Sequence, residues 1–98
     1  MVVIASPVNS IASIFPELKS CLGGSTIITD AGSVKAPIVD AAVTGLDDKI
    51  VNFVPGHPIA GKEKSGVEAA SATLFNGHRT KLTPLELTAT EALTLIHI

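Results

Sequence analysis

Residues 50–61 read Ile50-Val-Asn-Phe-Val-Pro-Gly-His-Pro-Ile-Ala-Gly61 and combine a short apolar run with an abrupt stop. Residues 50–54 are mostly apolar and β-branched without alternation, which is typical of a strand covered on both faces. Pro55-Gly56 then ends this run with turn residues. Residues 1–5 and 26–29 have the same character, and residues 80–83 form a weaker fourth candidate. The chain is therefore predicted to contain about four short strands.

The segment between the first two strands predicts a helix. Its apolar residues recur every three or four positions, so they mark one face of a helix. Asn9 or Ser10 can cap its start, and Gly23-Gly24 is expected to stop it. Pro16 lies inside the pattern and is expected to bend or split the helix.

Three more segments predict helices. Residues 36–43 form the second, which is expected to end at Gly45, and the Ala-rich residues 67–75 form the third. Thr88 and Glu91 have the spacing of a capping box and would open a fourth. Strands that alternate with helices predict an α/β fold, a parallel sheet of about four strands with flanking helices. The length of 98 residues predicts one domain.

Composition excludes several classes of protein. The chain is 46% hydrophobic and 16% charged, which excludes a disordered tail. Its net charge of −2 and scattered basic residues argue against a nucleic-acid binder or a membrane-surface protein. No apolar run reaches the roughly 18 residues of a transmembrane helix, and residues 1–15 have no basic start, so we expect no signal peptide. The single cysteine, Cys21, cannot form an internal disulfide, and we expect a cytoplasmic protein.

Reactive side chains follow the carboxyl ends of the predicted strands, where ligands bind in open α/β sheets. His57 stands between Gly56 and Pro58 directly after a strand. An imidazole there can take a proton from a hydroxyl that is being oxidised. The alternative is that His57 forms hydrogen bonds within its own turn.

Ser33 and Lys35 follow the second predicted strand at the start of the second helix. Free N–H groups of a helix start and a lysine ammonium would suit an anion, although Ser33 could instead only cap the helix. The polar loop 61–66 could close over a ligand or be solvated surface. His78 and His97 have no partners at metal-ligand spacing, so we expect no metal site.

Several stretches together resemble the prephenate dehydrogenase family, which includes arogenate dehydrogenases. The resemblance covers nearly the whole chain, and its most specific part is the Gly-His-Pro-Ile-Ala-Gly block followed by Glu-Lys-Ser-Gly. The matching stretches are Val2-Val-Ile-Ala-Ser-Pro-Val8, Thr29-Asp-Ala-Gly-Ser-Val-Lys35, Phe53-Val-Pro-Gly-His-Pro-Ile-Ala-Gly61, Glu63-Lys-Ser-Gly-Val-Glu-Ala-Ala70 and Leu82-Thr-Pro84.

The resemblance implies oxidative decarboxylation of prephenate, or the matching oxidation of arogenate, with NAD or NADP. His57 would accept the proton of the ring hydroxyl, and Ser33 would hold that hydroxyl and His57 in register. The resemblance also implies a substrate-binding group and a cofactor-binding group. The first consists of Ser33, Lys35 and Glu63, and the second of Ala5, Ser6, Pro7 and Asp30.

The chain also departs from the family pattern. It contains no G-x-G-x-x-G turn, so it resembles the second half of a Rossmann cofactor domain, with the first half and the helical C-terminal domain absent. We therefore expect the isolated chain to be inactive. The strand at residues 1–5 would become an unguarded edge, which predicts a homo-oligomer. A non-catalytic self-associating domain and a small-molecule binder remain as alternatives.

Overall fold

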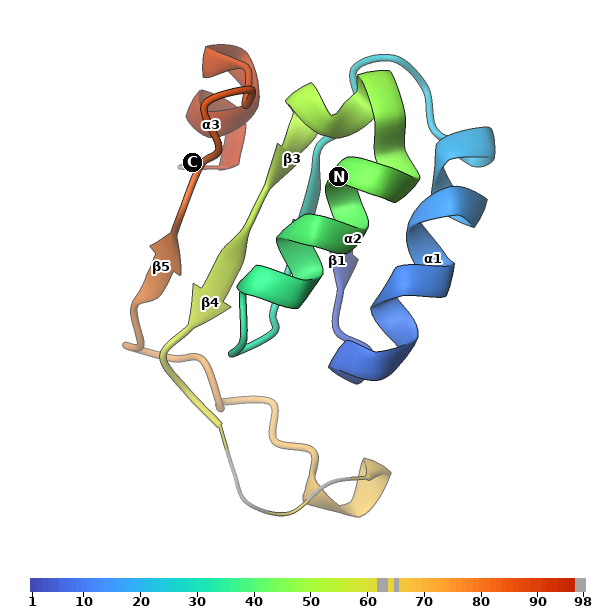
Figure 1. Ribbon diagram of the computed structural model, residues 1–98. Helices are drawn as coiled ribbons and strands as arrows, with labels where there is room; N and C mark the ends of the chain where they lie inside the picture. The colour runs from blue at the N-terminus through green and yellow to red at the C-terminus, as the bar shows by residue number, and fades with distance from the viewer. Residues whose placement is uncertain (62–63, 65, 97–98) are drawn as a thin grey trace.

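The structure, a computed structural model, describes residues 1–61, 64 and 66–96. Its centre is a parallel sheet in the order β1-β2-β3, formed by Val2–Ile4, Ile28–Asp30 and Phe53–Val54. Helices α1 (Val8–Cys21) and α2 (Ala36–Leu46) connect these strands and lie together against one face of the sheet (Figure 1). The predicted α/β fold with a parallel sheet and flanking helices is confirmed.

The main core lies between the sheet and the two helices. Phe15 of α1 and Phe53 of β3 are fully buried, and their rings meet edge to face with centroids 5.4 Å apart. The other buried members of this core come from both helices, from β1 and β2 and from the turn after α2, namely Ile4, Ile11, Ile28, Ile38, Ala42, Leu46 and Ile50. The spacing of the apolar residues in α1 and α2 directs them to this core.

Helix α1 begins and continues differently from the prediction. It starts at Val8 after Pro7, without a side-chain cap, and the Ser10 hydroxyl donates to the Pro7 carbonyl at 2.9 Å. The expected cap by Asn9 or Ser10 is therefore wrong. Pro16 lies inside the helix without splitting it, and at this point α1 packs closely against Gly45 of α2.

The expected end of the second helix at Gly45 is also wrong, since α2 continues to Leu46. A Cβ at Gly45 would lie 2.7 Å from Phe15 Cβ and 3.1 Å from Pro16 Cδ. Glycine stands here because α1 and α2 approach each other closely.

Side chains from the turn after α2 complete the far end of α1. A 3-10 segment, η1 (Asp47–Asn52), follows α2 directly. Its Lys49 ammonium donates to the carbonyls of Lys19 (at 2.8 Å) and Leu22. Asp47 pairs with the Lys19 ammonium at 2.8 Å. The last carbonyls of a helix lack partners within the helix, and a cation there is favourable. At the end of α1 this cation is the ammonium of Lys49, which lies 30 and 27 residues after the two residues it binds.

The strand predicted at residues 50–54 is shorter in the structure, because η1 includes residues 50–52. After the buried Pro55 the chain extends again as β4 (Gly56–Pro58). Strand β5 (Thr80–Leu82) pairs with β4 in antiparallel orientation. The expectation of a fourth parallel strand at residues 80–83 is therefore wrong, since this strand returns beside β4 after a long loop (Figure 1).

The helix expected at residues 67–75 is replaced by a single 3-10 turn, η2 (Val67–Ala69), followed by further turns. Val67 is 88% exposed and Phe75 is 58% exposed, so neither side chain packs on the core. A short helix is only marginally stable without such packing, which explains why the Ala-rich composition does not suffice.

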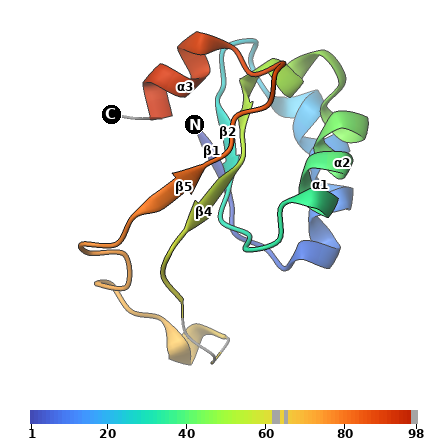
Figure 2. The same cartoon turned by 60° about the vertical axis from the view of Figure 1, so that its left-hand side comes forward.

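Helix α3 (Thr90–Ile96) lies on the opposite side of the sheet from α1 and α2 (Figure 2). Its Ala92 packs with Ile27 and Val54 in a second, smaller core. The Thr88 hydroxyl accepts from the Leu85 N–H and donates to the Phe53 carbonyl. It therefore ties the loop to β3, and the expected capping box with Glu91 is wrong.

None of the helices in the described part of the chain has the length and hydropathy needed to cross a membrane.

Candidate functional site

The carboxyl ends of the three parallel strands meet at one edge of the sheet. Ile4 lies opposite Asp30 in the register, and Thr29 lies opposite Val54. The segments that follow carry Ser6-Pro7, Ser33 and His57 in strand order, at the lower end of the sheet in Figure 1. The topology thus brings the three predicted parts of a site to the same edge.

His57 lies in strand β4, where it pairs with Lys81 of β5, and it is half-buried. The sequence suggested a turn at this position, but the backbone is extended. Because side chains alternate along a strand, the imidazole lies on the opposite face of β4 from Pro58. An extended, paired backbone holds the ring more firmly than a free loop would.

Ser33 is exposed and lies in the bend between β2 and α2. Helix α2 begins at Ala36 with Lys35 in the capping position, and no side chain caps it. The alternative in which Ser33 caps this helix is therefore wrong. The Ser33 hydroxyl remains available to a ligand at the carboxyl-end edge.

Asp30, which is buried, and Lys35, which is half-buried, form an ion pair at the end of β2. The Asp30 carboxylate also accepts the N–H of Gly32 at 2.9 Å and the N–H of Gly56 at 3.2 Å. The Lys35 ammonium donates to the Gly56 carbonyl as well. Sequence reasoning placed both residues in the site but missed this pairing. The sequence did contain a signal for the bond between Asp30 and the Gly32 N–H, since an aspartate two residues before a glycine favours a turn closed by its own side chain.

The start of α1 has features that fit a polar ligand. The Ser6 hydroxyl oxygen is buried and has no hydrogen-bond partner among the described residues. Helix α1 has no side-chain cap and no acidic residue in its first turn, so its N–H groups favour an anion or a hydroxyl oxygen. Ala5 and Pro7 on either side of Ser6 are exposed. This edge of the sheet therefore offers a hydroxyl and helix N–H groups to a polar ligand.

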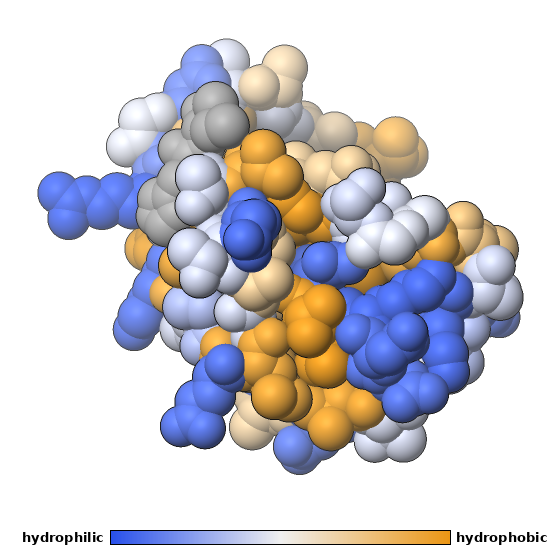
Figure 3. Space-filling view, turned by 90° about the horizontal axis from the view of Figure 1, so that it is seen from above, coloured by the Kyte–Doolittle hydropathy of each residue, from blue (hydrophilic) through white to orange (hydrophobic). Residues whose placement is uncertain are grey.

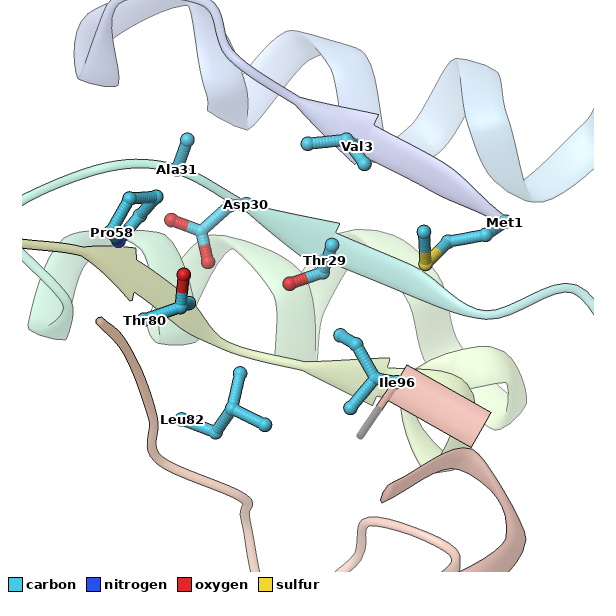
Figure 4. A pocket seen from close by; sticks show the side chains of 9 residues that line it. All are labelled: Met1, Val3, Thr29, Asp30, Ala31, Pro58, Thr80, Leu82 and Ile96. Carbon is cyan, nitrogen blue, oxygen red and sulfur yellow. The ribbon is translucent and has the colours of Figure 1, made fainter. Parts of the chain in front are cut away.

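A groove that sequence reasoning did not predict lies on the sheet face opposite α1 and α2. Its volume is about 360 Å³, and a neighbouring hollow of about 240 Å³ shares four of its lining residues. Figure 4 shows side chains from β1, β2, β4, β5 and α3 around it. They are Met1, Val3, Thr29, Asp30, Ala31, Pro58, Thr80, Leu82 and Ile96.

Hydrophobic side chains also reach the surface at the end of the molecule where α3 lies, between hydrophilic ones (Figure 3). Met1, directly before β1, is 74% exposed, and Val3 in β1 is 55% exposed.

The remaining candidates lie elsewhere. Glu63 and His97 fall outside the described residues. The His78 ring shares a hydrogen bond of 3.0 Å with the Ile59 carbonyl. Within residues 1–61, 64 and 66–96, no three His, Cys, Asp or Glu side chains gather as metal ligands.

The chain is similar to known proteins over nearly its whole length. The family described as "Prephenate dehydrogenase, nucleotide-binding domain" matches residues 1–97. Cyclohexadienyl dehydrogenase of Zymomonas mobilis is 33% identical over 96 residues, which are 98% of this chain and 32% of that protein. Prephenate dehydrogenase of Bacillus subtilis is 41% identical over 92 residues, 93% of this chain and 24% of that protein.

A solved structure agrees with these matches. Prephenate dehydrogenase of Aquifex aeolicus, in complex with hydroxyphenyl propionate and NAD+, superposes with a TM-score of 0.84 at 38% identity. The match covers 98% of this chain and 32% of that one. The chain thus spans about a quarter to a third of the length of these relatives.

Proposed function

Since the chain belongs to the prephenate dehydrogenase family, we propose that it forms the part of a dehydrogenase site that faces the nicotinamide and the reacting ring of prephenate or arogenate. The observation that carries this proposal is the shared edge at the ends of β1, β2 and β3, which collects Ser6, Ser33 and His57. We propose the 98 residues as the second half of a Rossmann cofactor domain.

The proposed chemistry removes a hydride, a proton and a carboxylate from the substrate. NAD or NADP, when bound, accepts the hydride from the ring carbon that carries the hydroxyl group. A ring nitrogen of His57 accepts the hydroxyl proton, for which an imidazole is suited near neutral pH. The bond to the ring carboxylate of prephenate then breaks, CO2 leaves, and its bonding electrons make the ring aromatic. The resulting phenolate oxygen takes back the proton from the His57 imidazolium.

The other proposed roles are positioning and binding. Ser33, exposed beside α2, donates a hydrogen bond to the substrate hydroxyl. The Ser6 hydroxyl, which lacks a partner among the described residues, bonds the nicotinamide ribose, with Ala5 and Pro7 beside it. Asp30 and Lys35 stand at the same edge, and we retain Glu63 as a substrate-binding candidate from the family resemblance.

A chimera tests the catalytic role of His57 within a whole enzyme. Residues 1–98 replace the matching segment of the Bacillus subtilis relative, and NADH formation from prephenate is followed at 340 nm. We expect turnover, and we expect His57→Asn in the chimera to lower kcat by roughly 10²–10⁴-fold, the usual contribution of general base catalysis. Turnover that survives His57→Asn would refute the proposed role. His78→Asn is the matched control and should leave kcat unchanged.

The isolated 98-residue chain is expected to bind weakly and to lack turnover. It contains no glycine-rich dinucleotide turn, and correct positioning of both reactants supplies roughly 7–11 kcal/mol of a barrier. We expect no binding of NAD or NADP at submillimolar concentration. At higher concentrations of NAD or NADP, the NMR signals of Ser6, Ser33 and His57 should be the first to shift. Shifts confined to other surfaces would refute the proposed site.

We also propose that the isolated chain forms a homo-oligomer through β1. A second proposal is that the protein is cytoplasmic. Strand β1 pairs only with β2 among the described strands, and its Val3 is 55% exposed. An apolar edge without lysine or proline favours pairing with another chain. Cys21 is exposed and free, which is ordinary for a reducing compartment. A monomer in sedimentation at tens of micromolar would contradict self-association.

A further inference from the structure

We propose that Asp30 and Lys35 are positioning residues for His57. Their ion pair takes the place of a neighbouring strand along one edge of β4 and fixes the peptide groups on both sides of Gly56. The inference rests on the proposed function in one respect, because it takes His57 as the side chain that must be placed. The positioning itself is a property of the ligand-free chain.

The hydrogen bonds of the pair converge on one residue of β4. Asp30 is 2% exposed, and its Oδ1 accepts the Gly56 N–H at 3.2 Å. Its Oδ2 accepts the Gly32 N–H at 2.9 Å and pairs with the Lys35 ammonium. That ammonium also donates to the Gly56 carbonyl. Both polar groups of the Gly56 backbone are therefore bound by one ion pair.

These bonds lie on the edge of β4 that faces away from β5. The Thr83 N–H donates to the Pro55 carbonyl at 3.0 Å, and the Ile59 N–H donates to the Arg79 carbonyl at 2.7 Å. Polar groups of successive residues alternate between the two edges of a strand, so those of Gly56 point toward β2. Strand β5 holds one edge of β4, and Asp30 with Lys35 holds the other.

Close packing requires this arrangement. A Cβ at position 56 would lie 2.8 Å from the Asp30 carbonyl oxygen and 2.9 Å from Thr29 Oγ1. Glycine thus allows β4 to lie directly against the end of β2. The Gly56 carbonyl belongs to the same planar peptide group as the backbone nitrogen of His57. By binding this carbonyl, Lys35 fixes the orientation of the peptide group that leads into His57.

The burial of the pair agrees with a role inside the protein. The Asp30 side chain is 0% exposed and the Lys35 side chain is 20% exposed. A buried charge costs free energy unless it is paired and hydrogen-bonded, and here every bond named ends on the turn at Gly32 or on Gly56. If Asp30 and Lys35 only bound a ligand, replacing them would change ligand affinity and leave the ligand-free backbone at Gly56 as it is. If they position His57, replacing them changes the Gly56 backbone without any ligand.

Amide hydrogen exchange on the ligand-free 98-residue chain tests the proposal. The variants are Asp30→Asn, Lys35→Met and the double variant that carries both changes. In Asp30→Asn and in the double variant, we expect the protection of the Gly56 amide to fall roughly tenfold or more relative to that of Val2, as the loss of a charged hydrogen-bond acceptor implies. Asp47→Asn is the matched control, because it breaks an exposed ion pair with Lys19. It should leave Gly56 unchanged.

The double variant separates positioning from general stability. It leaves no unpaired buried charge, so its unfolding midpoint should return toward that of the unaltered chain. Its Gly56 amide should still exchange fast, and the NMR signals of the His57 ring should still be shifted while those of His78 keep their positions. Native protection at Gly56 together with native His57 signals would overturn the proposal. Lys35→Met alone keeps both N–H bonds to Asp30 and removes the bond to the Gly56 carbonyl. It should therefore shift the NMR signals of the His57 ring, and native His57 signals in Lys35→Met would overturn the proposal if the other variants do not fold.

The outcome is independent of the proposed function. Altered exchange at Gly56 with an inactive chimera would support the positioning and refute the function. An active chimera with unaltered exchange in the double variant would do the reverse.

Discussion

The two faces of the β1-β2-β3 sheet come from the same strands but are covered to different extents. Toward α1 and α2, each strand contributes a buried residue, namely Ile4, Ile28 and Phe53. On the other face, Val54 is buried and Thr29 is nearly so, while Val3 in the same register is 55% exposed. The first face therefore carries the stability of the fold, and the second is open over β1 for a ligand or another chain.

The largest expected effect tests where the stability lies. Phe15→Ala removes a fully buried ring from the covered face and should lower the free energy of unfolding by about 3–5 kcal/mol. A domain of this size has about 5–15 kcal/mol in total, so the urea concentration at the unfolding midpoint should fall markedly. Val3→Ala on the open face should change it by less than about 0.5 kcal/mol. Urea unfolding compares the two, and equal losses would remove the distinction between the faces.

A smaller effect tests how tightly the covered face is packed. Gly45→Ala places a methyl group 2.7 Å from Phe15 Cβ, and such overpacking costs about 1–3 kcal/mol. Gly24→Ala meets no atom within 4 Å and should stay within about 0.5 kcal/mol of the unaltered chain. Thermal unfolding monitored by circular dichroism measures both. A Gly45→Ala protein with raised Tm would show that α1 and α2 have room to separate.

The open face should respond in association rather than in stability. Val3→Lys places a charge on the edge strand, which natural sheets use to prevent pairing. We expect the sedimentation coefficient to fall to that of a monomer, with an unfolding free energy changed by less than about 0.5 kcal/mol. Val67→Lys, at a site 88% exposed in η2, should leave association as it is. Dissociation by Val67→Lys alone would place the contact elsewhere.

The smallest effect concerns the rim of the covered face, where Asp47 pairs with Lys19. The hydrogen bond from Lys19 and its charge lower the pKa of Asp47 from 3.8. A carboxyl with a lowered folded pKa stabilises the protein above its unfolded pKa and loses this contribution as pH falls through the folded pKa. The stability difference between the unaltered chain and Asp47→Asn should therefore be small at neutral pH and shrink below pH 3.8. A difference that grows on acidification would contradict the pairing.

The sequence predicted the parts of the fold that follow from local pattern. The uninterrupted β-branched runs identified the three parallel strands, and the apolar residues at every third or fourth position identified α1 and α2. Both patterns are local, because each reflects how its own segment is buried. The edge that carries Ser6, Ser33 and His57 followed from the topology alone. Prediction of His57 and Ser33 as catalytic residues still awaits the experiments above.

What the sequence missed depends on contacts between distant segments. Residues 67–75 have helical composition, but they find no surface to pack against. The antiparallel return of β5 depends on a loop whose path no local pattern specifies. Gly45 was read as a stop, although it marks a close contact with Phe15 of another helix. The bonds that Asp30 and Lys35 make to Gly56, which lies 26 and 21 residues further along the chain, also depend on such contacts.

The Lys49 bonds to the end of α1 have a consequence for the order of folding. The carbonyls of Lys19 and Leu22 are satisfied by a side chain that lies 30 and 27 residues further along the chain. Because these bonds join segments so far apart in the sequence, we expect them to form late in folding, once β2, α2 and η1 are in place. Interactions that form after the transition state mainly slow unfolding. We therefore expect Lys49 to prolong the lifetime of the folded chain and to have little effect on the rate at which it forms.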